Sequence, residues 1–310
     1  MAFGNQQAGA GWTAVTLEGE RISIAEMARR PGARPQVRLC ESFAREGSLL
    51  DALKRLKNAK RLARNRCTTL LEHGQYQLLQ VSLPDNLPSD TPREELREVL
   101  RWRVKEMVDF PVDQAGFDVL EIPVQGARAP QCWVVAASHG VLRPRVQLFQ
   151  DAKLPLAAID IPEFAQRNLA SLFEEDERGL ALVAFDADGQ GGGRLTITYQ
   201  GELYMTRHLD VGAAELASPD AGKLHDRTLL DIQRTLDSFD RTYSAISLSR
   251  LLVGPLPQGE AFIAYLQDNL ALPVAKANLA DVLDCGAVPR LLEVGAQAAA
   301  WLTLGAALRD

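Results

Sequence analysis

The sequence contains few of the residues that build metal centres or covalent cross-links. It has four cysteines in 310 residues. Cys40, Cys67, Cys132 and Cys285 are far apart, and neither a CxxC pair nor zinc-finger spacing relates them. This pattern argues against a structural zinc site and against a disulfide framework, so we expect buried, unreactive thiols and no bound metal.

Histidine is equally scarce and stands outside known catalytic motifs. The four histidines are His73, His139, His208 and His225, and none lies in a motif such as GxSxG or HExxH. Because these motifs place a nucleophile or a metal beside its catalytic base, their absence removes the usual signal of hydrolytic chemistry. We therefore assign no catalytic residue.

Long apolar runs are also missing. A membrane-spanning helix needs roughly 18–20 consecutive apolar residues. The nearest candidate, 291–308, is interrupted by Glu293 and Gln297 and predicts a buried helix rich in small residues. The N-terminal segment 1–15 lacks the positive charge and apolar stretch of a secretory signal, so we expect a cytoplasmic protein.

The charge balance disfavours nucleic acid as a partner. The formal net charge is −6, whereas nucleic-acid binding needs a basic surface that displaces counterions. Basic residues do gather around a predicted helix at 47–63. This helix could contact anionic lipid headgroups or form a solvated face, and we favour the solvated face. The residues are Lys54, Arg55, Lys57, Lys60, Arg61, Arg64 and Arg66.

The length and an apolar content of 46% are sufficient for two sizeable cores. Strand-like segments at 12–19, 21–29 and 35–44 predict three antiparallel strands that open an α/β domain with a mixed sheet. After the helix at 47–63, the segments 67–74 and 75–84 predict a further hairpin around His73-Gly74.

The clearest local signal is Thr91-Pro92-Arg93-Glu94. Thr91 suits a helix cap, Pro92 the first helical position, and Glu94 closes a capping box. Apolar residues continue with a period of 3.6 to Val108, and Pro111 predicts the helix end. The segments that follow complete a small α+β unit inserted into a larger domain. They are strands at 117–123 and 132–138, a helix at about 143–152, a strand at 155–162 and a helix at 163–173, and Ser138–Gly140 is expected as a strand end that enters a turn.

The acidic segment 174–177 predicts the boundary to a second half. Three strand-like segments follow, with a tight turn at Gln200-Gly201. The remaining elements are a long helix at 223–244, a strand at 249–255, a helix at 261–270, a strand at 272–278 and a terminal helix at 290–308.

Six segments resemble one known family and occur in its order. They are EVLRWRVKEMVDFPVDQAGFDVLEIP (98–123), AAIDIPEFAQRNLA (157–170), LTITYQGELYMTRHL (195–209), LLDIQRTLDSFDRTY (229–243), AYLQDNLALPVAKAN (264–278) and AAAWLTLGAALRD (298–310). The sequence resembles the family of the type IV pilus assembly protein PilM, the MSHA pilus biogenesis protein MshI and the cytoplasmic part of the type II secretion protein GspL. Within it, the sequence is most similar to MshI.

The resemblance implies an α/β, actin-like (ribonuclease H-like) fold of two lobes. The first lobe would cover 1–177, with an inserted α+β subdomain at about 86–142, and the second would cover 178–310. In PilM relatives, a groove beside the inserted unit binds the short cytoplasmic N-terminus of a membrane-bound PilN-like protein. The resemblance therefore implies a PilN-like partner and a position at the inner face of the bacterial inner membrane.

Two of the three elements that would hold a nucleotide in this fold depart from the family pattern. In the first hairpin, Thr16–Glu20, the family aspartate is missing, and Glu18 and Glu20 place negative charge beside any phosphate. The third element is Val253–Pro257, where only Gly254 survives and two prolines remove backbone donors. Both departures argue against nucleotide binding.

The second hairpin is ambiguous. Its glycines could bring the backbone close to phosphate, and its aspartates could hold a metal-bound water. We favour a longer turn between two strands, because the loop is one residue longer than the family pattern. The candidate nucleotide-site residues are Asp186, Asp188, Gly189, Gly191, Gly192, Gly193 and Gly254.

These departures predict a non-enzymatic scaffold of type IV (MSHA-type) pilus assembly that binds no cofactor. The alternative is an ATP-binding switch that uses Mg-ATP to set its affinity for the partner. For the partner, Trp102 lies off the apolar stripe of its helix between Arg101 and Arg103, and aromatic and arginine residues often anchor interfaces. The other interpretation is that Trp102 packs against the inserted sheet or the adjacent lobe.

Overall fold

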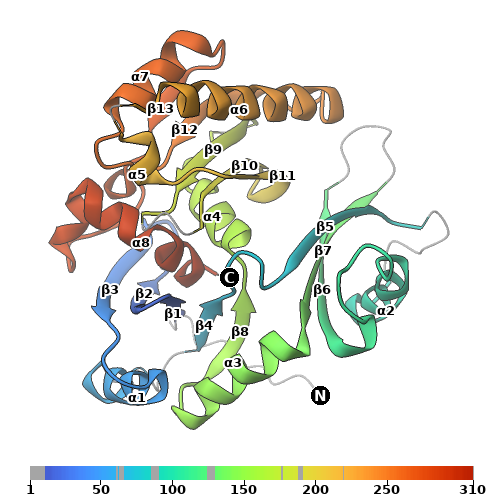
Figure 1. The fold of residues 1–310 in the computed structure, drawn as a ribbon, viewed down its shortest axis with the longest axis vertical. Helices are drawn as coiled ribbons and strands as arrows, with labels where there is room; N and C mark the ends of the chain where they lie inside the picture. The colour runs from blue at the N-terminus through green and yellow to red at the C-terminus, as the bar shows by residue number, and fades with distance from the viewer. Residues whose placement is uncertain are drawn as a thin grey trace.

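The computed structural model describes residues 11–60, 62, 66–84, 91–123, 130–175, 177–187, 191–218 and 220–309. Two five-stranded sheets have the same strand order (Figure 1). The first is β3-β2-β1-β4-β8 and the second is β11-β10-β9-β12-β13. Their strands are β1 (Thr13–Glu18), β2 (Arg21–Ala28), β3 (Gln36–Ala44), β4 (Cys67–Leu70), β8 (Leu156–Asp160), β9 (Gly179–Phe185), β10 (Gly193–Tyr199), β11 (Glu202–Leu209), β12 (Leu248–Val253) and β13 (Val274–Lys276).

Each sheet opens with three consecutive antiparallel strands and then adds two parallel strands. The predicted turn at Gln200-Gly201 is confirmed, because both residues have positive φ, 51° and 75°, between β10 and β11.

The helices are α1 (Leu49–Lys60), α2 (Arg93–Arg103), α3 (His139–Asp151), α4 (Pro162–Ala170), α5 (Ala213–Leu216), α6 (Gly222–Thr242), α7 (Glu260–Asn269) and α8 (Val294–Ala307).

A third sheet is inserted into the first lobe between β4 and α3 (Figure 1). Its order is β5-β7-β6, from β5 (Gln77–Ser82), β7 (Gln131–Ser138) and β6 (Ala115–Ile122), and α2 packs against it. The inserted sheet therefore starts earlier than the expected boundary near residue 86. The hairpin expected around His73-Gly74 is wrong, because β4 pairs with β1 and β8 whereas β5 pairs with β7.

Two helices connect the lobes. α4 packs against β10 and β11 of the second sheet, α8 packs against β1 and β2 of the first, and the two helices cross each other. Their contact is close, since a Cβ on Gly305 would lie 2.2 Å from the carbonyl oxygen of Ala165. The hydroxyl of Thr303 on α8 is hydrogen-bonded at 2.8 Å to that of Thr16 on β1.

Three helix limits differ from the sequence prediction. α2 begins at Arg93 with Pro92 as its N-cap, and it ends at Arg103 rather than near Pro111. The following turn is held to β5 by two hydrogen bonds between Gln77 and Asp109, of 2.7 and 3.0 Å. Ser138–Gly140 does not end in a turn, because α3 begins at His139. The terminal helix is preceded by a separate 3-10 turn at Pro289–Leu292.

The four cysteines are buried and free, as expected. Burial raises the pKa of the Cys67 thiol to about 12, and it does the same for Cys132. Because the reactive form of cysteine is the thiolate, these thiols are unreactive near neutral pH. Within the described part of the chain, no helix has both the length and the apolar character to cross a membrane.

Candidate functional site

A cavity of about 230 Å³ lies between the lobes where the first two hairpins converge. The end of β1 and the turn after it contribute Glu18 and Gly19, and the turn after β9 contributes Asp186 and Gly191. Helix α8 forms another wall, which includes Trp301. The structure therefore brings together two of the three elements that the sequence singled out.

In the second hairpin, the described glycines are accounted for by their neighbours. A Cβ on Gly191 would lie 1.7 Å from Oδ2 of Asp186, so the carboxylate occupies the space beside this glycine. Gly192 has a φ of +69°, which glycine adopts without strain. Asp188 and Gly189 lie outside the described residues.

The acidic residues of the first hairpin separate. Glu18 lines the cavity, whereas Glu20 accepts a 3.0 Å hydrogen bond from Nε of Arg45. The expectation that both carboxylates lie beside the phosphate position is therefore wrong for Glu20. Another carboxylate, Glu72, follows β4 and also lines the cavity.

The third element does not reach the cavity surface. Gly254 is buried, and a Cβ there would lie 2.8 Å from that of Ala184. Its N–H donates to the carbonyl of Val183 at 2.7 Å. Gly254 therefore serves the contact between neighbouring strands and does not line the space between the hairpins.

The lining fits Mg-ATP poorly. Three acidic residues, Glu18, Glu72 and Asp186, line the space and would repel a triphosphate. The lining also includes two arginines, but Arg194 pairs with Glu163 and Arg21 donates to the hydroxyl of Ser42. The volume of about 230 Å³ is below the roughly 300–1,000 Å³ typical of sites for drug-sized ligands. No group of three or more metal-ligating side chains occurs among the described residues.

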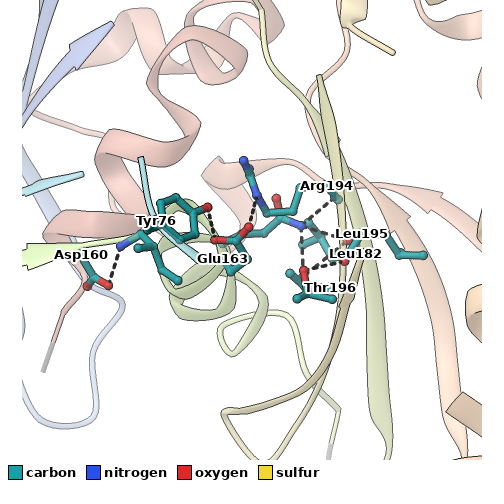
Figure 2. Close-up of polar contacts among 10 residues, drawn as sticks. Tyr76, Asp160, Glu163, Leu182, Arg194, Leu195 and Thr196 are labelled. Carbon is teal, nitrogen blue, oxygen red and sulfur yellow. Dashed lines mark hydrogen bonds and ion pairs between the residues drawn. The ribbon is translucent and has the colours of Figure 1, made fainter. Parts of the chain in front are cut away.

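A buried arginine that the sequence analysis did not single out occupies one side of the cavity. Arg194, on β10, is 2% exposed and its Nε lies 3.4 Å from Oε1 of Glu163. The hydroxyl of Tyr76 donates to the other oxygen of Glu163 at 2.6 Å. Figure 2 shows these three side chains pointing toward one another. One turn further along α4, Nε2 of Gln166 donates to the carbonyl of Arg194 at 3.0 Å.

The electrostatics of this cluster favour charged Arg194. Burial alone lowers the pKa of the guanidinium, but the carboxylates of Glu163 and Asp186 outweigh it and leave the pKa raised. Burial and the neighbouring carboxylate of Glu163 raise the pKa of Tyr76, so its hydroxyl stays protonated and donates. The cluster therefore joins Tyr76 of the first lobe, Glu163 of α4 and Arg194 of the second lobe through a hydrogen bond and an ion pair.

Two histidines meet at the edge of the same cavity. The rings of His73, which follows β4, and His208, on β11, are stacked at 3.9 Å between centroids with 6° between their planes. Nε2 of His208 lies 3.5 Å from Oδ1 of Asp210. This stack is a further direct contact between the lobes.

The predicted partner-binding residues lie on α2, away from this cavity. Trp102 is 65% exposed, so the interpretation that it packs into the protein is wrong. Arg103, the last residue of α2, is also exposed, whereas Val104 after it is buried. Arg101 instead lies over the ring of Phe117 at 5.5 Å, and Lys105 covers the Trp102 ring at 5.6 Å.

A groove of about 160 Å³ lies between the inserted unit and the first lobe. Its apolar lining includes Leu120, Val135 and Phe164. At its edges, Arg93 pairs with Asp118 at 2.9 Å, and Arg309 pairs with Asp160. The groove thus combines an apolar floor with charges of both signs.

Comparison with known proteins supports the fold. No family model and no curated protein matches the chain. The solved PilM-PilN type IV pilus biogenesis complex matches with a TM-score of 0.73 and 18% identity, over 96% of this chain and 98% of that chain. With the duplicated strand order, this confirms the predicted α/β, actin-like two-lobed fold with its inserted subdomain.

Two further structures are similar at a lower level. The cytoplasmic domain of EpsL, an inner-membrane component of the Vibrio cholerae type II secretion system, has a TM-score of 0.42 and 14% identity over 67% of this chain and 75% of that chain. A Bacteroides thetaiotaomicron protein of unknown function with an actin-like ATPase fold has a TM-score of 0.47 and 9% identity over 92% and 96%.

Proposed function

We propose that this protein is a non-enzymatic scaffold of type IV pilus assembly that binds the cytoplasmic N-terminal segment of a PilN-like inner-membrane protein. The observation that carries the proposal is a groove beside the inserted unit, in a chain whose fold matches PilM over nearly its whole length. The sequence resemblance to MshI supports an MSHA-type system. The protein would work at the inner face of the inner membrane, held there through its partner.

The groove suits a short extended peptide. β8 and β6, which lie at the edges of their sheets, both contribute residues to it. An edge strand can pair with the backbone of an added segment, while pockets between the strands select its side chains. The apolar floor would take an apolar side chain, and the two ion pairs could exchange partners with peptide charges.

Rigid contacts between the inserted unit and the second lobe support a scaffold. Nε1 of Trp133 donates to the carbonyl of Leu203 at 2.8 Å, and Nε2 of Gln80 donates to the hydroxyl of Tyr243 at 2.8 Å. Both bonds join β7 or β5 to the second lobe. Such contacts, one buried and one partly buried, oppose the opening and closing of the lobes that a nucleotide switch would need.

The alternative is an ATP-binding switch, which the convergence of two hairpins on one cavity favours. In that case Asp186, with Asp188, would hold a magnesium-bound water, and nucleotide would set the affinity for the partner. The carboxylates that line the cavity argue for the scaffold.

The groove is tested by titrating the chain with a fluorescently labelled peptide that corresponds to the cytoplasmic N-terminus of a PilN-like protein. We expect Leu120→Ala to weaken binding about tenfold, since it removes part of the floor and a tenfold change corresponds to about 1.4 kcal/mol. Leu230→Ala is the matched control, because Leu230 is an exposed leucine on α6 of the second lobe. Equal affinities for the two variants would place the peptide elsewhere. Trp102 and Arg103 remain a predicted second contact for the same partner.

A further inference from the structure

Arg194 is placed to act between the lobes rather than within one of them. It leaves β10 in the second lobe and meets Glu163 in the first turn of α4, the helix that follows the last strand of the first lobe. Tyr76, which donates to Glu163, stands between β4 and β5 of the first lobe. The three groups thus form a continuous chain of contacts (Figure 2) beside the cavity, which Arg194 lines.

Burial makes this chain of contacts sensitive to the loss of any member. Arg194 and Glu163 are 2% and 7% exposed, and a buried ion pair that loses one partner leaves an uncompensated charge in a poorly solvated site. Arg194 also lines the cavity beside Asp186, whose carboxylate is attracted to the guanidinium. The single guanidinium of Arg194 therefore interacts with the carboxylates of both Glu163 and Asp186.

The residues that line the cavity lead to the same conclusion when a bound ligand is considered. The hairpins that meet there present carboxylates, and the guanidinium of Arg194 already attracts the carboxylates of Asp186 and Glu163. A ligand cation would compete with Arg194 for these groups, and a phosphate would face Glu18 and Glu72 as well as Arg21. The positive charge that attracts these carboxylates is therefore supplied by the protein itself, through Arg194.

We propose that Arg194 is a built-in cation that holds the two lobes together beside the cavity, so that lobe closure needs no bound nucleotide. This inference does not depend on the identity of the partner. It assigns to Arg194, with Glu163 and Tyr76, a positioning role in holding the hairpin turn at 17–21 and the segment 71–76 against the second lobe.

Hydrogen exchange followed by mass spectrometry tests the proposal on the whole chain. We expect Arg194→Met to speed exchange at least tenfold in segments 17–21 and 71–76, while β2 and β3 keep their protection. Arg234→Met is the matched control, because Arg234 is an exposed arginine on α6. Unchanged exchange in the two cavity segments of Arg194→Met would overturn the proposal.

Two further arms separate closure from general stability. Arg194→Lys keeps the charge but loses the planar fork, so exchange between that of the wild type and Arg194→Met is expected; exchange equal to that of the wild type would contradict a role for the ion-pair geometry. If Arg194→Met does not fold, Arg194→Lys carries the test alone. Wild-type protein with millimolar Mg-ATP should exchange as it does without it, and added protection of segments 17–21 and 71–76 would show that nucleotide closes the lobes.

Discussion

At the scale of single residues, His208 illustrates how the space between the lobes controls a side chain. Burial lowers the pKa of this histidine, and the positive charges of His73 and Arg194 lower it further, whereas Asp210 and Glu163 oppose the shift. Its Nδ1 is buried without a hydrogen-bond partner among the described residues. The neutral ring is therefore the form that the folded protein favours.

This depressed pKa predicts a stability that depends on pH. The unfolded chain binds a proton on His208 near its ordinary pKa of about 6.5, and the folded chain does so only at lower pH. The contribution of His208 to the free energy of unfolding is then complete above about pH 6.5, and it is lost as the pH falls through the lower pKa of the folded state. Urea midpoints of wild type and His208→Gln should be measured from pH 5 to 7.5. The difference between them should increase with pH, and the wild type should gain the higher midpoint.

A difference that is independent of pH would contradict this account of His208. His73→Gln provides the second arm, because it removes the stacked ring whose positive charge disfavours protonation of His208. The dependence on pH should be weaker in this variant than in the wild type.

At the scale of elements, the crossing of α4 and α8 determines how closely the two lobes approach. Gly305→Ala would place a methyl group 2.2 Å from the carbonyl oxygen of Ala165, and separating the helices should cost about 2 kcal/mol of unfolding free energy. Gly222→Ala is the control, since no atom lies within 4 Å of a Cβ at that position. Urea denaturation that gives equal midpoints for the two variants would show that the helix contact tolerates the extra group.

The elements also show which structural signals are local. The strand segments of both sheets and the turn at Gln200-Gly201 could be predicted, because alternation and positive-φ turn residues are encoded within a few positions. The partner of β5 could not, since β5 pairs with β7 across an intervening helix and strand. The end of α2 was missed for a similar reason, because the side chain of Gln77 holds the turn that follows it.

The residues of the candidate site also divide into those that the local sequence predicts and those that depend on distant segments. Asp186 and Gly191 were identified from a loop pattern and do line the cavity. Arg194 gave no local signal, because a single arginine at the start of a strand is ordinary until Glu163 and Tyr76 arrive from distant segments. Trp102 was correctly placed off the apolar stripe, but only the structure shows that Arg101 turns back onto Phe117.

At the scale of the whole molecule, the two lobes repeat one strand order and are joined by crossed helices, a buried ion pair and a histidine stack. The inserted unit adds the contacts of Trp133 and Gln80 to the second lobe. A molecule connected in this way is suited to present a fixed groove. This arrangement supports partner binding that is independent of nucleotide.

Isothermal titration of the full chain with the N-terminal peptide of the PilN-like protein, with and without millimolar Mg-ATP, tests this central claim most directly. The account predicts binding with the same Kd in both titrations and no heat from Mg-ATP alone. Absence of peptide binding would contradict the proposed partner. A Kd that changes with Mg-ATP would instead identify the protein as a nucleotide-dependent switch.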